Sequence, residues 1–155
     1  MSRKRVYVRP MTLADVPAVA KIDAMEFSHP MFEEDFAGFF KSKSRRQFVI
    51  DTGYAVQAFL VLHIEKEAEF VERMATHCDF GDDMQAMFFF LPELRKRIRD
   101  TDRRLVVPVN DHDDAAIEFF RSQGFMATGI IREACEDESD AICFEFGEDL
   151  VRERG

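Results

Sequence analysis

A short apolar run in the C-terminal half limits the folds open to this chain. Residues 105–109 are Leu, Val, Val, Pro and Val, without one polar side chain. A strand of this kind is covered on both faces, so the sequence requires a sheet flanked by helices. Pro108 has no backbone N–H, and we expect that end of the strand to lie at an edge or where two strands separate.

Strand-like and helix-like patterns follow one another along the rest of the chain. Alternating or β-rich runs predict strands at 6–11, 47–51, 54–64, 69–76, 105–109, 128–131 and 141–146. Apolar residues at helical spacing predict helices at 12–27, 33–40, 82–91 and 113–123. Pro92 is expected to kink the third helix or to start a new one. This order predicts one mixed α/β domain over residues 1–155.

Composition excludes several classes of protein. With 155 residues, 46% of them hydrophobic, the chain can bury a core without disulfides or a structural metal. Thirty acidic against 21 basic residues give a net charge of -9, so we expect no nucleic-acid partner. The longest apolar run, 84–91, is too short for a membrane helix, and residues 6–9 alternate unlike a signal peptide. Three cysteines without a CxxC spacing favour a cytoplasmic protein.

Two stretches carry a family resemblance. Residues 8–19 read VRPMTLADVPAV and lead to FSHP at 27–30, while AAIEFF at 115–120 is followed by QGF at 123–125. Together they resemble the opening strand and helix and the late helix of the GNAT superfamily of acyl-CoA-dependent N-acyltransferases, especially its branch that acetylates protein N-termini. The resemblance implies a GNAT fold, with a central mixed, mostly antiparallel sheet flanked by helices. It also implies acetyl-CoA as cofactor.

The cofactor loop of that family falls at 80–87, which reads FGDDMQAM. In the family, backbone N–H groups of this loop and of the next helix bind the pyrophosphate of coenzyme A. Here Met84 and Ala86 stand at the glycine-type positions, Gly81 is out of register, and Asp82 lies among acidic neighbours where the pyrophosphate would sit. The resemblance thus implies a degenerate loop. A plainer interpretation is that the aspartates only cap a buried helix.

Further positions follow from the same resemblance. The backbone of Met74, Ala75 and Thr76 would hold the thioester and pantetheine as an added strand. Asp113 replaces an asparagine that usually contacts the cofactor. Phe120 replaces the tyrosine that protonates the leaving thiolate in this branch.

The resemblance also indicates a reaction. Glu72 would deprotonate the amine substrate directly or through water. The plainer interpretation of Glu72 is an exposed strand residue, or one in a salt bridge near Arg73. The acidic charge favours a cationic small-molecule or peptide amine. The alternative function is a catalytically inactive GNAT-fold module that binds a small ligand or a protein partner. The 17 phenylalanines suggest a homodimer.

Two other patterns carry weaker hypotheses. His77, Cys78 and Asp79 include ligand-type side chains, but no second pair follows at a metal spacing, so we expect no metal. The basic residues of 95–99 are expected to form the solvated face of a helix. Contact with the 3′-phosphate of the cofactor is their alternative role.

Overall fold

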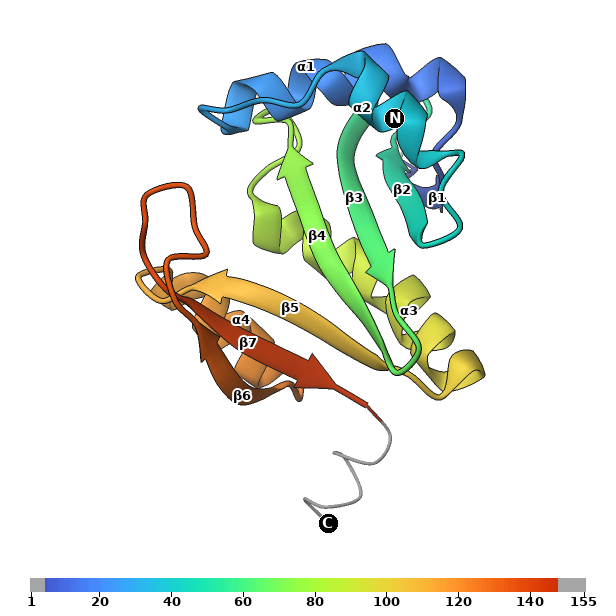
Figure 1. Ribbon diagram of the computed structural model, residues 1–155. Helices are drawn as coiled ribbons and strands as arrows, with labels where there is room; N and C mark the ends of the chain where they lie inside the picture. Colours follow the sequence, from blue (N-terminus) through green and yellow to red (C-terminus); the bar gives the residue numbers. More distant parts are fainter. Residues whose placement is uncertain (1–4, 148–155) are drawn as a thin grey trace. The chain divides into compact units, whose positions relative to one another are not determined.

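The computed structural model describes residues 5–147, which form two compact units (Figure 1). The first unit consists of residues 5–64 and 72–93, and the second of 65–71 and 94–147. Strand β4 (Ala68–Thr76) and helix α3 (Asp83–Thr101) contribute to both units. The seven strands have the sheet order β1-β2-β3-β4-β5-β7-β6.

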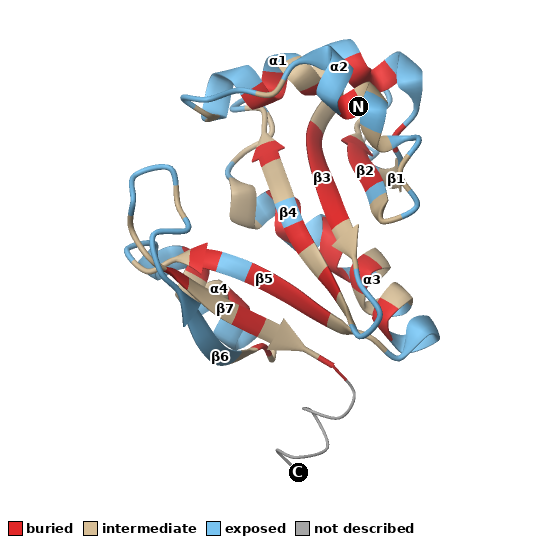
Figure 2. Ribbon diagram, in the orientation of Figure 1, coloured by how far each residue is buried: buried red, intermediate tan, exposed pale blue. Residues whose placement is uncertain are grey.

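Antiparallel strands build the first unit. Strand β2 (Arg45–Asp51) pairs with β1 (Tyr7–Pro10) on one side and with β3 (Val56–Ile64) on the other. The β2–β3 turn forms because Gly53 has a φ of +87° and donates its N–H to the Asp51 carboxylate at 2.7 Å. The strands predicted at 47–51 and 54–64 are thereby joined as a hairpin. In Figure 2 the middle of β3 is buried throughout.

Two helices cover these strands. The predicted first helix begins as a short 3-10 turn (Leu13–Asp15) and continues as α1 (Val16–Glu26), and α2 follows (Glu33–Phe39). Their inner residues share one core with the strands, and the cluster comprises Met11, Val16, Val19, Ile22, Phe36, Val49, Phe59, Val61 and Ala75. Asp15 anchors the entry to α1, because its carboxylate accepts two hydrogen bonds from Arg9 at 2.7 and 3.0 Å and one from the Thr12 N–H. The Arg9 guanidinium lowers the pKa of Asp15.

Helix α3 runs without interruption from Asp83 to Thr101, with Pro92 inside it. The alternative of a new helix starting at Pro92 was therefore wrong, and the helix continues beyond the predicted end at residue 91. The apolar residues of one helix side are buried on both sides of the proline: Ala86, Met87, Phe90, Leu91, Leu94 and Ile98. Burial of this side outweighs the loss of one backbone hydrogen bond.

The second unit contains the parallel strand pair. Its strands are the start of β4, β5 (Arg104–Asn110), β6 (Met126–Ile131) and β7 (Ala141–Phe146). Residues 68–70 of β4 pair in parallel with residues 104–106 of β5, whereas β7 is antiparallel to both β5 and β6. Pro108 is therefore tolerated, because it lies beyond the β5 residues that pair with β4.

Helix α4 (Asp114–Ser122) ends as its sequence predicts. Gly124 has a φ of +89°, and the Phe125 N–H donates to the carbonyl of Phe120 at 3.0 Å. The rings of Phe120 and Phe125 lie 5.1 Å apart, which buries the helix end. No helix among residues 5–147 has the length and apolar character needed to cross a bilayer.

A buried carboxylate joins three segments of the second unit. Glu69 in β4 is inaccessible to solvent and accepts from Arg97 at 2.9 Å and from Arg103 at 3.1 Å. Arg95 donates to the carbonyl of Gln123 at 2.9 Å. The basic segment predicted as a solvated helix face is thus partly committed to contacts inside the unit.

Candidate functional site

The candidate site lies in the first unit, where β4 leads into α3. The last residue of the strand is bound to the first residue of the helix, because the Thr76 hydroxyl donates to the Asp83 carboxylate at 2.7 Å. The connecting residues 77–82 begin with the His77 N–H, which donates to the carbonyl of Gln57 at 2.8 Å. Of the predicted positions, Met74, Ala75, Thr76, Gly81, Asp82, Met84 and Ala86 all belong to this strand, loop and helix start.

The first turn of α3 is closed by reciprocal hydrogen bonds. The Gln85 N–H donates to the Asp82 carboxylate at 2.9 Å, and the Asp82 N–H donates to the Gln85 side-chain oxygen at 2.8 Å. This is a capping box with aspartate and glutamine. The capping box requires a glycine at position 81, just before Asp82. The φ of Gly81 is +148°, and a Cβ there would lie 1.8 Å from Oε1 of Gln85. The plainer interpretation of the aspartates, as helix caps, is therefore correct for Asp82.

Two donors of this turn remain for a ligand. Within residues 5–147, the N–H groups of Asp83 and Met84 donate to no protein acceptor. Two adjacent N–H groups at a helix N-terminus fit one phosphate group of a cofactor. The exposed carboxylate of Asp82 and the half-buried one of Asp83 oppose that anion. The turn therefore fits a phosphate, but with fewer donors and more negative charge than a glycine-rich loop offers.

The side chains expected to flank the cofactor differ in burial. Ala75 and Ala86 are inaccessible to solvent, so only their backbone atoms are candidates for ligand contact. Met74 and Met84 are half-buried.

A buried ion pair braces the strand side of the site. Asp23 in α1 has no solvent exposure, and its carboxylate accepts from Nε and Nη2 of Arg73 at 2.6 and 3.0 Å. The same carboxylate accepts the Met31 N–H at 2.7 Å, and Arg73 also donates to the carbonyl of His29 at 3.2 Å. The Arg73 guanidinium stands 3.9 Å from the centre of the Phe27 ring. These contacts fix the α1–α2 connection against β4.

Glu26 and Asp83 form a pair of like-charged groups next to this brace. Partial burial of the Glu26 carboxyl, its hydrogen bond to Asp83 and the charges of Asp83 and Asp23 raise the pKa of Glu26 well above its ordinary value, while Arg73 opposes the shift. Asp83 also accepts from Thr76, so this pair connects α1, β4 and α3.

Glu72, predicted as the catalytic base, is exposed and held by Arg45. Its two carboxylate oxygens accept from Nε and Nη2 of Arg45 at 2.6 and 3.0 Å. The alternative interpretation as an ion-paired strand residue describes this geometry, with Arg45 as the partner. Glu72 would have to exchange a contact with Arg45 for one with substrate before it could accept a proton.

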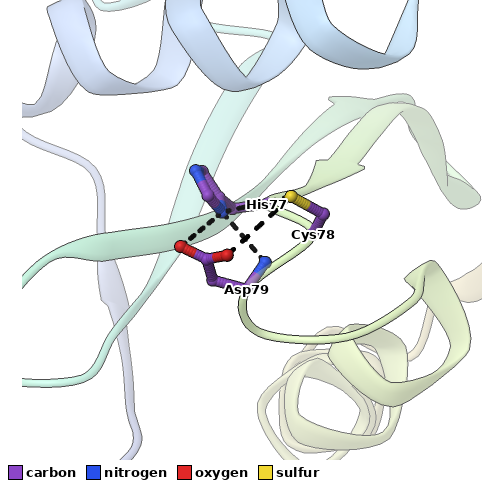
Figure 3. Close-up of side chains that lie close together, drawn as sticks. All are labelled: His77, Cys78 and Asp79. Carbon is purple, nitrogen blue, oxygen red and sulfur yellow. Dashed lines mark hydrogen bonds and ion pairs between the residues drawn. The ribbon is translucent and has the colours of Figure 1, made fainter.

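His77, Cys78 and Asp79 come together in the loop after β4 (Figure 3). One ligand-type atom of each lies within 4.8 Å of the others. However, Nδ1 of His77 accepts the Asp79 N–H at 3.0 Å, and Cys78 and Asp79 are exposed. The cluster is therefore explained by the tight turn itself, and we assign no metal to it.

Asp113 and Phe120 belong to the second unit. The Asp113 carboxylate caps α4 by accepting the Ala116 N–H at 3.1 Å. Phe120 is 1% exposed and stacks on Phe144 with ring centres 5.9 Å apart. Its ring has no proton to donate to a leaving group.

Two residues of the candidate site have no counterpart in the sequence predictions. Gln85 could have been found, because Asp followed three residues later by Gln is a capping-box spacing. The sequence does not indicate Glu26 as a site residue, because Glu26 is the last residue of α1 and contacts Asp83 only in the folded chain.

Comparison with known proteins gives a result for structure only. No protein-family model and no curated protein matches this sequence. Among solved structures, the ribosomal-protein-S18-alanine N-acetyltransferase of Escherichia coli is similar with a TM-score of 0.78 and 20% identity, over 92% of this chain and 94% of that chain. A dodecameric spermidine N-acetyltransferase from Vibrio cholerae gives a TM-score of 0.79 at 12% identity, over 99% of both chains.

A third structure was determined with a cofactor. The GNAT family acetyltransferase from Elizabethkingia anophelis with acetyl-CoA bound gives a TM-score of 0.72 at 13% identity, over 94% of this chain and 99% of that chain. Identities this low establish the fold alone. The chain has the GNAT acetyltransferase fold, with its mixed, mostly antiparallel sheet of seven strands, as the sequence resemblance predicted.

Proposed function

We propose that this protein transfers an acetyl group from acetyl-CoA to a primary amine. The observation that carries the proposal is the start of α3, where the N–H groups of Asp83 and Met84 are left for an anion after the loop that follows β4. The GNAT fold supports it, since its similar structures include N-acetyltransferases and one with acetyl-CoA bound. The three free cysteines suit the reducing cytoplasm, where we place the activity.

The N–H groups of Asp83 and Met84 would hold one phosphate of the cofactor, and the backbone of residues 74–76 would align its pantetheine arm. A bound acetyl-CoA would supply an activated thioester: a C–N bond to the amine would form, the C–S bond would break, and the departing thiolate would take up a proton from water. The amine must lose a proton in this step. Glu72 is our first candidate to accept that proton, directly or through water.

The Glu26–Asp83 pair is the second candidate proton acceptor. The pKa of Glu26 is raised to about 9, so its carboxyl is protonated at neutral pH and would accept the amine proton only after losing its own, at alkaline pH. The net charge of -9 favours a cationic acceptor such as a polyamine or a free peptide N-terminus.

Binding and transfer are tested separately. Acetyl-CoA binding is measured by isothermal titration, and transfer by mass spectrometry with spermidine and with a peptide bearing a free N-terminal alanine. The same peptide with a blocked N-terminus is the matched control for the acceptor. Glu72→Gln and Glu26→Gln are compared at saturating acetyl-CoA, where loss of transfer with intact binding identifies the base.

A non-catalytic module is the second candidate function, and the Asp82–Gln85 capping box favours it. The box occupies a donor that a phosphate would otherwise take, and it leaves a carboxylate at the same place. Absence of acetyl-CoA binding by the natural protein, together with binding by Asp82→Asn, would support a GNAT-fold module with a closed cofactor site. Binding without transfer to either amine would contradict only the acceptor class.

A further inference from the structure

The two aspartates at the start of α3 differ in what their carboxylates contact. Asp82 accepts the Gln85 N–H at 2.9 Å and so caps the helix. Within residues 5–147, no backbone N–H donates to the carboxylate of Asp83. Its Oδ1 instead accepts the Thr76 hydroxyl at 2.7 Å, and the carboxylate is also hydrogen-bonded to the Glu26 carboxyl. Asp83 is therefore bound to β4 and α1 and not to the helix turn that it begins.

This position is unusual for an aspartate at a helix start. Such a side chain ordinarily accepts first-turn N–H groups, which have no partner in the helix and carry partial positive charge. Asp82 does so in α3 and Asp113 in α4. The N–H groups of Asp83 and Met84 are donors of the same kind, and no acceptor within residues 5–147 takes them. An Asp83 carboxylate that rotated freely would compete with any anion for these two donors.

Glu26 restrains this carboxylate only while Glu26 is protonated. An ionised carboxylate has no hydrogen to donate, so a hydrogen bond between two carboxyl groups requires one proton. Partial burial, the hydrogen bond to Asp83 and the charges of Asp83 in α3 and Asp23 in α1 raise the pKa of Glu26 to about 9, while Arg73 in β4 opposes the shift. At neutral pH, Glu26 and Asp83 therefore carry one negative charge between them.

We propose that the side chains of Thr76 and Glu26 are positioning groups of the phosphate site, because they hold the Asp83 carboxylate away from the N–H groups of Asp83 and Met84. These donors then stay open to an anion. The inference rests on the proposed binding of acetyl-CoA and deepens it. All four residues belong to the first unit. The Thr76 hydroxyl acts at every pH, whereas Glu26 loses its effect as it ionises.

The first test uses the protein without a ligand. Two-dimensional proton–nitrogen NMR spectra give the amide shifts of Asp83 and Met84 in the natural protein, Thr76→Val and Thr76→Ser. In Thr76→Val we expect at least one of the two amide protons to move downfield, because the released carboxylate accepts it. Thr76→Ser keeps the hydroxyl and should restore the natural shifts. Thr128→Val is the matched control, because Thr128 is an exposed strand threonine of the second unit.

The second test measures acetyl-CoA binding by isothermal titration at neutral pH and at about pH 10. Thr76→Val should raise the Kd about fivefold at both pH values, and Thr76→Ser should reverse most of this loss. The natural protein should bind about fivefold more weakly at the higher pH, because Glu26 is then ionised beside the anion. Glu26→Gln keeps a neutral donor to Asp83, so its Kd should change less than about twofold between the two pH values. Glu67→Gln, at an exposed glutamate, should behave like the natural protein.

The two tests separate this inference from the proposed function. Absence of acetyl-CoA binding by the natural protein at both pH values would contradict the proposed function, while the NMR shifts still decide what restrains Asp83. Unchanged Asp83 and Met84 amides in Thr76→Val would overturn the role of Thr76, and the same pH dependence in Glu26→Gln as in the natural protein would overturn that of Glu26.

Far-UV circular dichroism establishes that each variant is folded. If Thr76→Val does not fold, a pH titration of the same two amides replaces it. They should move with a midpoint near the Glu26 pKa of about 9 in the natural protein and stay in place in Glu26→Gln. Equal movement in both proteins would overturn the proposal.

Discussion

The carboxylate of Asp23 and the guanidinium of Arg73 form a two-point ion pair at 2.6 and 3.0 Å, with Asp23 fully buried and the Arg73 side chain 20% exposed. Asp23→Asn should lower the free energy of unfolding by roughly 2–4 kcal/mol, because it leaves a mostly buried cation without a counter-charge. Urea unfolding measures the change. Glu72→Gln is the matched control, since its pair with Arg45 is more exposed and should cost about 0–1 kcal/mol. Equal losses in the two variants would contradict the role given to burial.

Asp82→Asn should strengthen acetyl-CoA binding. Asparagine caps helices as well as aspartate does, so the contact with Gln85 remains while the negative charge beside the phosphate position is removed. Relief of one like-charge contact is worth about 1 kcal/mol, which corresponds to roughly a fivefold lower Kd. The test is titration calorimetry, with Asp79→Asn as control because Asp79 lies outside the helix turn and its side chain is 78% exposed. Weaker binding by Asp82→Asn would indicate that the phosphate lies elsewhere.

Glu26→Gln should make the protein more stable at neutral pH. Because the folded pKa of Glu26 lies above its ordinary value, the folded state binds the proton more tightly than the unfolded chain does. Stability conferred by this group is therefore full below the ordinary glutamate pKa and falls as the pH rises toward the folded pKa. The variant removes this dependence and a like-charge contact with Asp83, with an expected gain of roughly 0.5–1 kcal/mol.

This pH dependence is tested by measuring the thermal midpoints of Glu26→Gln and of the natural protein from mildly acidic to alkaline pH. The two curves should be closest at acidic pH and diverge as the pH rises. Glu67→Gln is the control, because Glu67 is an exposed glutamate in the β3–β4 connection. A constant difference at every pH would show that the Glu26 proton is not linked to folding.

Loss of the Glu69 charge should destabilise the second unit. Glu69 is buried between Arg97 and Arg103, whose side chains are 22% and 29% exposed, so Glu69→Gln removes the buried negative charge that both arginines contact. We expect a loss of roughly 2–4 kcal/mol in unfolding free energy. Glu145→Gln is the comparison, because Glu145 is 3.8 Å from a more exposed Arg104 and should contribute much less. Hydrogen exchange of the β5 amides would localise the effect, and unchanged exchange there would contradict it.

Local patterns explain why most elements were predictable. The β2–β3 hairpin is determined by a turn that residues 51–53 form among themselves, and the end of α4 is determined by Gly124. Pro92 misled the prediction because its local cost is outweighed by burial of Phe90, Leu91 and Leu94, and that burial depends on the folded core. Tertiary contact overrides local preference at such positions.

The candidate site was less predictable than the fold. The positions of Gly81, Asp82 and Met84 follow from the chain order, but the pairing of Glu72 with Arg45 and of Glu26 with Asp83 joins segments that are distant in sequence. Asp23 is a further example. The helical pattern around it does not indicate that its carboxylate pairs with Arg73, which is distant in sequence.

The parallel pairing of residues 68–70 with residues 104–106 also has a kinetic consequence. The hairpins β2–β3 and β6–β7 form between neighbouring segments, whereas this pairing must bring together strands separated by the whole of α3. Closing that long loop costs chain entropy before any contact offsets it, so we expect this pairing to limit the folding rate. Glu69 lies inside the pairing, and its arginine partners come from the end of α3 and from just before β5. During synthesis, the Glu69 carboxylate would therefore lack both arginine partners until the end of α3 and the residues just before β5 have been made.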